Sequence, residues 1–320
     1  MKRLLSALLL ITVFLSASPI SLTPEKVLEI DGVCEDLQYK DGLLIVGTDS
    51  GKMVVYDSKS LEKKLSLQLP KIKDFMGDEI DTKVFSVDYS DGRYLLLSDS
   101  GIGGYADLRI YENGKEKKIV SGEDGKAIIK ARFVDKDHIL LGHLSNEAEL
   151  IDANSGKSLY RVQLAPSKFS DFALDSAKKR AVFGCESGVL TVIDAMSGKK
   201  IVTIDKLHVD NNFGVDFAKD LIASAGQDKR ACYYHMGTKE KGCFNGSFLV
   251  YAVGISPDER YVAYAMDEDN SITIYDMKSM QKAYILRGQK STLDAIVFES
   301  PERLFSASAD NSVMVWKLKK

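Results

Sequence analysis

One short pattern recurs along the chain at a nearly constant interval. A β-rich run ends in an aromatic residue or isoleucine, and a polar residue follows it. The first interval is 55 residues, and the next five are 40, 42, 41, 41 and 41. Such a period indicates a chain built from similar structural units. The seven pairs are Tyr56-Asp57, Tyr111-Glu112, Ile151-Asp152, Ile193-Asp194, Tyr234-His235, Tyr275-Asp276 and Trp316-Lys317.

Each unit has the same internal order. A strand leads into a turn rich in Asp, Gly or Pro, such as Asp41-Gly42, and an apolar second strand follows. The third strand carries the recurring pair, and a turn such as Asn154-Ser155-Gly156 leads to a fourth strand. Alternation with period 2, β-branched and aromatic residues, and the turn chemistry predict antiparallel pairing. The sequence therefore predicts an all-β fold, a seven-bladed β-propeller with four-stranded antiparallel blades.

The seventh unit lacks a fourth strand of its own, because the chain stops soon after Trp316. Residues 25–32, EKVLEIDG, resemble the fourth strand of the sixth unit at residues 281–288, QKAYILRG. We therefore predict that an N-terminal strand closes the last blade. This arrangement leaves no open sheet edge at the junction.

The first 18 residues differ from the rest. Lys2 and Arg3 give a positive start, the run from Leu4 to Ala17 is almost wholly apolar, and residues 16–18 are small. This pattern is typical of a secretory signal peptide. The alternative is an uncleaved membrane anchor, although a bilayer span needs roughly 20 apolar residues. We expect residues 1–18 to be the signal peptide and residues 19–320 the propeller, in a periplasmic or secreted protein with no stable membrane span after cleavage.

The chain has four cysteines and no CxxC pair, so neither a zinc site nor a thioredoxin-type motif is supported. Cys232 and Cys243 fall on the third and fourth strands of the fifth unit, about equally far from the turn between them. Facing Cβ atoms in such a ladder are roughly 4.5–5.5 Å apart, which a disulfide can bridge. We predict a Cys232–Cys243 disulfide, with Cys34 and Cys185 free. The alternative is two buried thiols.

The fifth unit resembles a WD40 repeat. In that family a His after the fourth strand meets an Asp in a turn, a Ser on the second strand and an aromatic residue on the third. The matching residues here are His208, Asp228, Ser224 and Tyr234. The seventh unit repeats the spacings at Ser306, Asp310 and Trp316, with Gln289 in place of the usual His. The resemblance implies a structural role for these residues. The first four units lack the His, so quinoprotein-type or other bacterial propellers stay open as alternatives.

An exported WD40-like protein of this length is similar to the periplasmic NapL-type accessory proteins of nitrate reductase systems. This resemblance rests on the leader, the length and the degenerate repeats. It implies a protein partner in the periplasm, such as a subunit of a respiratory reductase.

Catalytic motifs are missing. There is no GxSxG elbow, phosphate loop, dinucleotide-binding glycine pattern or HExxH. The four histidines share no metal-ligand spacing, and a net charge of -3 gives no electrostatic case for nucleic acid. We expect a monomeric, non-catalytic interaction scaffold with no cofactor, no metal site and no catalytic residues. The alternative is a cofactor- or metal-dependent propeller enzyme, quinoprotein-like or lactonase-like.

The first, longer interval marks about 14 extra residues, at Pro70 to Asp81 and at Gly101 to Asp107. In a four-stranded meander these two connections lie on the same face of the ring. Loops held by a rigid scaffold often carry function. We predict a partner site here, with apolar anchors Phe75, Met76 and Tyr105 and an acidic rim of Asp74, Asp78, Glu79, Asp81 and Asp107. The alternative is a neutral loop insertion.

Overall fold

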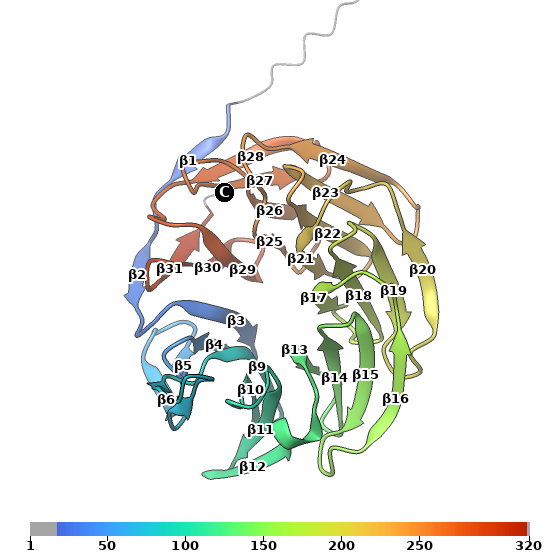
Figure 1. The fold of residues 1–320 in the computed structure, drawn as a ribbon. Coiled ribbons are helices and arrows are strands. Elements are labelled where there is room, and N and C mark those ends of the chain that lie inside the picture. Colours follow the sequence, from blue (N-terminus) through green and yellow to red (C-terminus); the bar gives the residue numbers. More distant parts are fainter. Residues whose placement is uncertain (1–17, 319–320) are drawn as a thin grey trace, which may run out of the picture.

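The computed structural model describes residues 18–318, so the predicted leader lies outside the described residues except for Ser18. Seven blades, each with four antiparallel strands, surround a central axis (Figure 1). The predicted seven-bladed propeller is therefore confirmed. Within residues 18–318 the one helix is a short 3-10 turn, η1 (Gly122–Asp124). No helix in that range is long and apolar enough to cross a membrane.

In each blade the first strand lies nearest the axis and the last lies outermost (Figure 1). Blade 1 contains β3 (Cys34–Lys40), β4 (Leu43–Thr48), β5 (Lys52–Asp57) and β6 (Lys63–Gln68). Blade 2 contains β9 (Val84–Ser90), β10 (Arg93–Asp99), β11 (Ala106–Glu112) and β12 (Lys115–Val120). Blade 3 contains β13 (Ile128–Phe133), β14 (His138–His143), β15 (Glu147–Asp152) and β16 (Ser158–Gln163). Blade 4 contains β17 (Phe169–Leu174), β18 (Arg180–Cys185), β19 (Leu190–Asp194) and β20 (Lys200–Ile204). Blade 5 contains β21 (Asn212–Phe217), β22 (Leu221–Gly226), β23 (Arg230–His235) and β24 (Lys241–Asn245). Blade 6 contains β25 (Val253–Ile255), β26 (Tyr261–Ala265), β27 (Ile272–Asp276) and β28 (Gln281–Leu286), and blade 7 contains β29 (Leu293–Ser300), β30 (Arg303–Ser308) and β31 (Ser312–Lys317).

The turns inside the blades follow from local sequence. Between β3 and β4, Asp41 and Gly42 have φ values of 50° and 78°. Two consecutive residues with positive φ match the type I′ turn that suits the twist of a hairpin, and Asp-Gly is a preferred sequence for it. The turn chemistry therefore sets the register of these strands.

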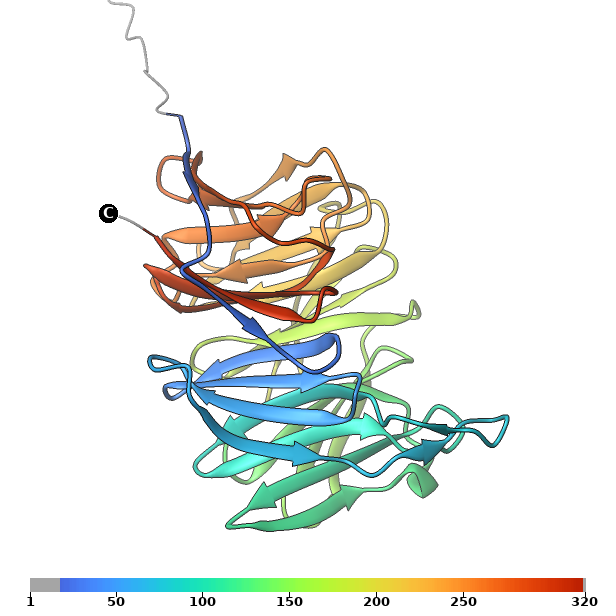
Figure 2. The same ribbon diagram turned by 90° about the vertical axis from the view of Figure 1, so that its left-hand side faces the viewer.

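The ring closes as the sequence predicts. Strand β2 (Lys26–Glu29) pairs antiparallel with β31, with Val27 opposite Met314 and Leu28 opposite Val313. This confirms the N-terminal strand as the fourth strand of blade 7. A second strand, β1 (Ile20–Leu22), was not predicted, and it adds in parallel to β28 of blade 6. The N-terminal segment therefore crosses the outside of two neighbouring blades (Figures 1 and 2).

The core lies between adjacent blades. The second and third strands are almost wholly buried, and their side chains pack against the blade on either side. At the junction of blades 7 and 1, for example, Phe305 and Val315 pack with Leu44 and Val46. This packing makes a rigid ring from which the connecting loops project.

Candidate functional site

The insertion between blades 1 and 2 forms a small hairpin. Strands β7 (Ile72–Lys73) and β8 (Glu79–Ile80) pair antiparallel. Asp74 stabilises the turn, because its Oδ1 accepts hydrogen bonds from the backbone N–H of Met76 and of Asp78, both at 2.9 Å. The hairpin projects from one face of the ring, which we call the upper face (Figure 2). The insertion is thus an ordered element with a defined tip.

The tip of the hairpin presents apolar side chains to solvent. Phe75 is 96% exposed and Met76 is 72% exposed, and Ile80 is also exposed. Protein surfaces carry single exposed apolar residues routinely, whereas adjoining ones on one projection are typical of an interaction site.

The structure brings the second insertion against the first. Gly101 of the second loop lies directly against the hairpin. A Cβ atom added at Gly101 would be 3.1 Å from Cβ of Ile72 and 3.2 Å from the carbonyl oxygen of Lys73. Ile102, in the same loop, is exposed. We call the hairpin of residues 72–80 together with the loop of residues 101–105 the hairpin site.

Two of the predicted site residues lie differently from the expectation. Tyr105 is half-buried at the base of the loop rather than fully exposed. Asp107 is only 4% exposed and does not belong to an acidic rim. Its carboxylate contacts Arg109 at 2.5 Å and Lys118 at 2.7 Å, and it accepts a hydrogen bond from the backbone N–H of Gly122. Asp107 lies on β11 and faces its blade's interior, so the prediction of a surface role was wrong.

The remaining acidic residues of the rim lie at the surface. Asp78, Glu79 and Asp81 are exposed, while Asp74 is half-buried and serves the turn. Asp81 lies 3.5 Å from Lys71, and such an exposed ion pair contributes little to stability. The hairpin site therefore combines exposed apolar residues with a rim of net negative charge.

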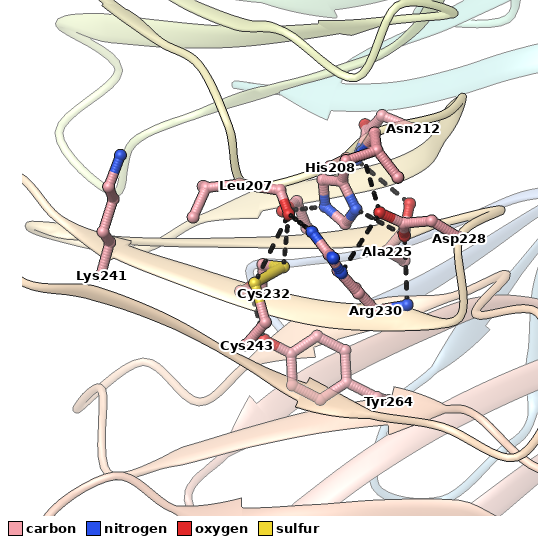
Figure 3. The surroundings of a disulfide bond; sticks show 12 residues. Leu207, His208, Asn212, Ala225, Asp228, Arg230, Cys232, Lys241, Cys243 and Tyr264 are labelled. Carbon is pink, nitrogen blue, oxygen red and sulfur yellow. Dashed lines mark hydrogen bonds and ion pairs between the residues drawn. A yellow bond between two sulfur atoms is a disulfide. The ribbon is translucent and has the colours of Figure 1, made fainter.

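Three of the WD40-like residues of blade 5 form a buried hydrogen-bond network, and Figure 3 labels two of them, His208 and Asp228. His208 Nδ1 lies 3.0 Å from Asp228 Oδ1, and His208 Nε2 lies 2.8 Å from Ser224 Oγ. Burial lowers the pKa of His208 in spite of the nearby carboxylate of Asp228. Tyr234 is buried in the adjoining core, and no hydrogen bond joins it to Ser224 within the described chain. The network anchors the loop between blades 4 and 5 and is closed to solvent.

Blade 7 uses the same positions with different chemistry. The indole N–H of Trp316 donates to Ser306 Oγ at 2.7 Å, and the side-chain amide of Gln289 donates to the same oxygen at 2.6 Å. Asp310 accepts a hydrogen bond from Ser308 Oγ at 2.8 Å. Gln289 thus takes the place that His208 has in blade 5.

Blade 3 carries a buried polar network that the repeat spacing does not reveal. His143 Nε2 lies 2.8 Å from Glu149 Oε2, and Lys126 Nζ lies 2.8 Å from Glu149 Oε1. His143 lies on the second strand of its blade, so a search for a His after the fourth strand misses it. Burial alone would raise the pKa of Glu149, but its hydrogen bonds from His143 and Lys126 outweigh burial and lower the pKa to about 2.

Cys232 and Cys243 face each other across β23 and β24 and form a disulfide, with Cα atoms 4.0 Å apart (Figure 3). Cys232 is fully buried, whereas Cys243 is exposed. Cys34 and Cys185 are buried free thiols.

A cavity of about 590 Å³ runs along the axis of the ring. Aspartates on the innermost strands line it, and four of them accept a backbone N–H from the innermost strand of the next blade. The pairs are Asp36 with Val87, Asp88 with Phe133, Asp171 with Val215 and Asp216 with Ile255, at 2.7–3.0 Å. These bonds join neighbouring blades near the axis. Among residues 18–318 no group of three or more His, Cys, Asp or Glu is placed to hold a metal ion.

No protein-family model and no curated protein matches the chain. Among solved structures, it is similar to the β-propeller domain of Cps50 (Swd1) from Myceliophteria thermophila, with a TM-score of 0.71 and 13% sequence identity. The match covers 92% of this chain and all of that domain. At this identity the likeness shows the propeller fold and nothing further, because a fold alone does not define a function.

Proposed function

We propose that the chain is an exported, non-catalytic interaction scaffold that binds its partner through the hairpin site. The observation that carries this proposal is the tip of the hairpin, where Phe75 is almost fully exposed and Met76 largely exposed on a turn held by Asp74. An ordered turn presents its anchors in one conformation, so less conformational entropy is lost on binding. Aromatic residues are among those that most often dominate binding energy.

The charge of the rim suggests the chemistry of the partner. Asp78 and Glu79 follow the apolar tip directly and, with Asp74, outnumber the one cation of the hairpin, Lys73. The matching surface therefore has an apolar pocket with basic residues at its edge. Long-range attraction of this kind speeds association and weakens as salt screens the charges. We therefore expect the association rate to fall as ionic strength rises.

We further propose that the scaffold is periplasmic and accessory to a respiratory enzyme such as nitrate reductase. The apolar leader and the resemblance to NapL-type proteins support this, and so does the disulfide, because disulfides persist in oxidising compartments. This finer proposal stands apart from the binding role, which does not depend on the identity of the partner.

The experiment is a titration of purified periplasmic nitrate reductase with the wild-type protein and with a double variant, Phe75→Ala with Met76→Ala. We expect the double variant to bind roughly 30-fold more weakly, because losing a hot-spot anchor costs about 2 kcal/mol or more. The matched control is Leu159→Ala with Met196→Ala, which removes two exposed apolar side chains from blades 3 and 4. The control should bind like the wild type.

Crosslinking with mass spectrometry in a periplasmic extract separates the two parts of the proposal. Crosslinks from Lys71 or Lys73 to another protein, lost in the Phe75 and Met76 double variant, would keep the hairpin site and reject nitrate reductase as the partner. Partner binding that is equal in both double variants would overturn the hairpin site itself.

A further inference from the structure

We infer that the Cys232–Cys243 disulfide is a thiol-exchange site, at which an anionic low-molecular-weight thiol such as glutathione becomes bonded to Cys243. The site lies on the two outer strands of blade 5, on the side that faces blade 4, and it does not rest on the hairpin site. One of its two sulfurs belongs to an exposed residue, and positive side chains flank the bond.

The two cysteines differ in their access to solvent. Cys232 on β23 is fully buried in the core between blades 4 and 5, whereas Cys243 on β24 is exposed. Strand β24 is the outermost of its blade, so within residues 18–318 no strand covers its outer edge. Thiol–disulfide exchange begins when a thiolate attacks one sulfur, and its rate depends on access to that sulfur. Cys243 is therefore the attacked residue, and Cys232 is the leaving group.

The step exchanges one sulfur–sulfur bond for another. The incoming thiolate forms a bond to Cys243 Sγ as the bond between Cys243 and Cys232 breaks, and Cys232 leaves with the electron pair and takes up a proton from solvent. The incoming sulfur is oxidised to the disulfide level while Cys232 is reduced to the thiol, so no other oxidant or reductant is needed. The product is a mixed disulfide at Cys243.

Two cationic side chains flank the disulfide (Figure 3). Lys241 precedes Cys243 by two residues, and Arg230 precedes Cys232 by two residues, so all four side chains lie on one face of the β23–β24 ladder. Arg230 Nη1 donates to the carbonyl oxygen of Leu207 at 3.2 Å, and each sulfur lies 3.6 Å from that same oxygen. Cations in this position attract an incoming thiolate and stabilise the charge on the departing sulfur.

The positive charge is only partly neutralised by the chain itself. Arg230 Nε lies 3.7 Å from Asp228 Oδ2, but the same carboxylate also contacts His208. Lys241 is exposed, donates to the carbonyl of Asp205 at 3.3 Å and forms no ion pair with a described residue. These surroundings favour a thiol of net negative charge over a neutral or cationic one. Glutathione, whose carboxylates outnumber its ammonium group, is such a thiol.

The released Cys232 finds a hydrogen-bond acceptor in the fold. In the disulfide neither sulfur carries a hydrogen atom, so the 3.6 Å approach to Leu207 is a contact only. Once the bond is broken, the thiol of Cys232 can donate to that carbonyl. Because the thiolate is the attacking form, a thiol held in this way is a weak nucleophile and re-closes the disulfide slowly. The backbone pairing of β23 with β24 remains, so the modification leaves the blade intact.

The first test compares glutathione with the cationic thiol cysteamine on the intact, oxidised protein at low salt. Acid quenching and peptide mapping at low pH follow the loss of the disulfide and locate the adduct. Each rate is divided by the rate of the same thiol on the neutral disulfide of 2-mercaptoethanol, so that intrinsic reactivity cancels. We expect the corrected rates to favour glutathione roughly five-fold, with the adduct on Cys243, and the preference to shrink at high salt.

A lysine variant tests the charge. Lys241→Gln should lower the preference for glutathione roughly two-fold or more. The matched control is Lys63→Gln, because Lys63 lies opposite Tyr56 in blade 1 as Lys241 lies opposite Tyr234 in blade 5. The control removes the same charge from the same register position of another blade and should leave the preference unchanged. Equal preferences in the two variants would overturn the selection for an anionic thiol.

Single-cysteine variants test which sulfur reacts, even where a second thiol removes the adduct before it can be mapped. In Cys232→Ser, the free Cys243 should form a mixed disulfide with oxidised glutathione in the absence of denaturant. In Cys243→Ser, the buried Cys232 should react roughly ten-fold or more slowly. An adduct on Cys232, equal reactivity of the two variants, or a wild-type disulfide that reacts only under unfolding conditions would overturn the inference.

The source of the thiol is distinguished with the peptide Glu-Ala-Cys-Ala-Glu, blocked at both ends and tested in the same rate assay. Reaction with glutathione alone would assign the site to a small thiol. Reaction with the peptide at a similar rate would extend the site to an exposed cysteine of a partner protein.

Discussion

Two regions depart most clearly from the repeat: the N-terminal seam, where β2 closes blade 7, and the hairpin before blade 2. They differ in whether their apolar side chains pack into the core. In the seam, β2 pairs with β31, and Leu28 and Ile30 pack into the core between blades 7 and 1. In the hairpin, β7 and β8 pair mainly with each other, and the apolar tip faces solvent. The seam therefore stabilises the ring, whereas the ring supports the hairpin without depending on it.

The largest expected effect is that of deleting residues 21–31. The deletion exposes the edge of β31, where Val313, Val315 and Trp316 are fully buried in the intact ring. An open edge with buried apolar residues pairs with other chains. We expect a large loss of thermal stability and aggregation, measured by circular dichroism melting and size-exclusion chromatography.

The control for the deletion is a variant in which Gly-Gly replaces residues 73–79. It removes the hairpin and leaves the seam intact, so we expect it to melt within a few degrees of the parent. A seam deletion that melts no earlier than this control would remove the distinction between the two regions.

The seam and the repeat were predictable because they depend on local chemistry. Period-2 alternation, Asp-Gly turns and the likeness of residues 25–32 to residues 281–288 are all visible along the chain. The buried charges were not predictable in the same way. Asp36 and Arg132 are 96 residues apart and meet only because the ring brings blades 1 and 3 to one axis.

Asp107 shows a second limit of sequence reasoning. An acidic residue next to a glycine-rich loop resembles a surface residue, and its burial depends on Arg109 two positions away and on Lys118 on the next strand. The sequence pattern gives the face of a strand on which a residue lies. It does not show which charged side chains of the same and neighbouring strands lie on that face.

The second-largest expected effect is a loss of folding stability in acid, which arises from the protonation of Glu149. Its pKa in the folded chain is about 2, below the ordinary value of 4.5, so the folded state binds its proton less readily than the unfolded state does. The stabilisation is therefore complete above pH 4.5 and is lost as pH falls toward 2. It amounts to up to roughly 3 kcal/mol. Denaturant unfolding from pH 6 to pH 2 measures it.

The matched control for this pH dependence is Glu149→Gln, which keeps the shape of the side chain and removes its titration. We expect the variant to be less stable at pH 6 and to lose less stability on acidification than the wild type. Identical slopes in the two proteins would show that the acid sensitivity arises elsewhere.

A smaller effect is expected from reducing the disulfide. The bond joins Cys232 and Cys243 within one hairpin, so the loop that it closes is short and the β23–β24 ladder remains. A short loop gives a modest constraint on the unfolded chain, and we expect reduction to cost about 2 kcal/mol. Melting with and without a thiol reductant measures this. Peptide mapping should find Cys243 alkylated only after reduction, and alkylation of both residues without reductant would reject the disulfide.

The smallest effect on stability should come from the residues that matter most for the proposed binding. Phe75 and Met76 are so exposed that the folded state gains almost nothing from them by burial, and their replacement by Ala leaves the Asp74 turn in place, since that turn uses backbone N–H groups. We expect the double variant to unfold within about 0.5 kcal/mol of the wild type. Tyr105→Ala is the internal contrast, because Tyr105 is half-buried and its ring packs over Gly103 of the same loop. That substitution should lower the melting temperature measurably, which separates an anchor presented to a partner from a side chain that holds the loop. If the Phe75 and Met76 variant destabilised the protein as much as Tyr105→Ala does, the hairpin tip would belong to the fold, and its exposure would no longer argue for a partner.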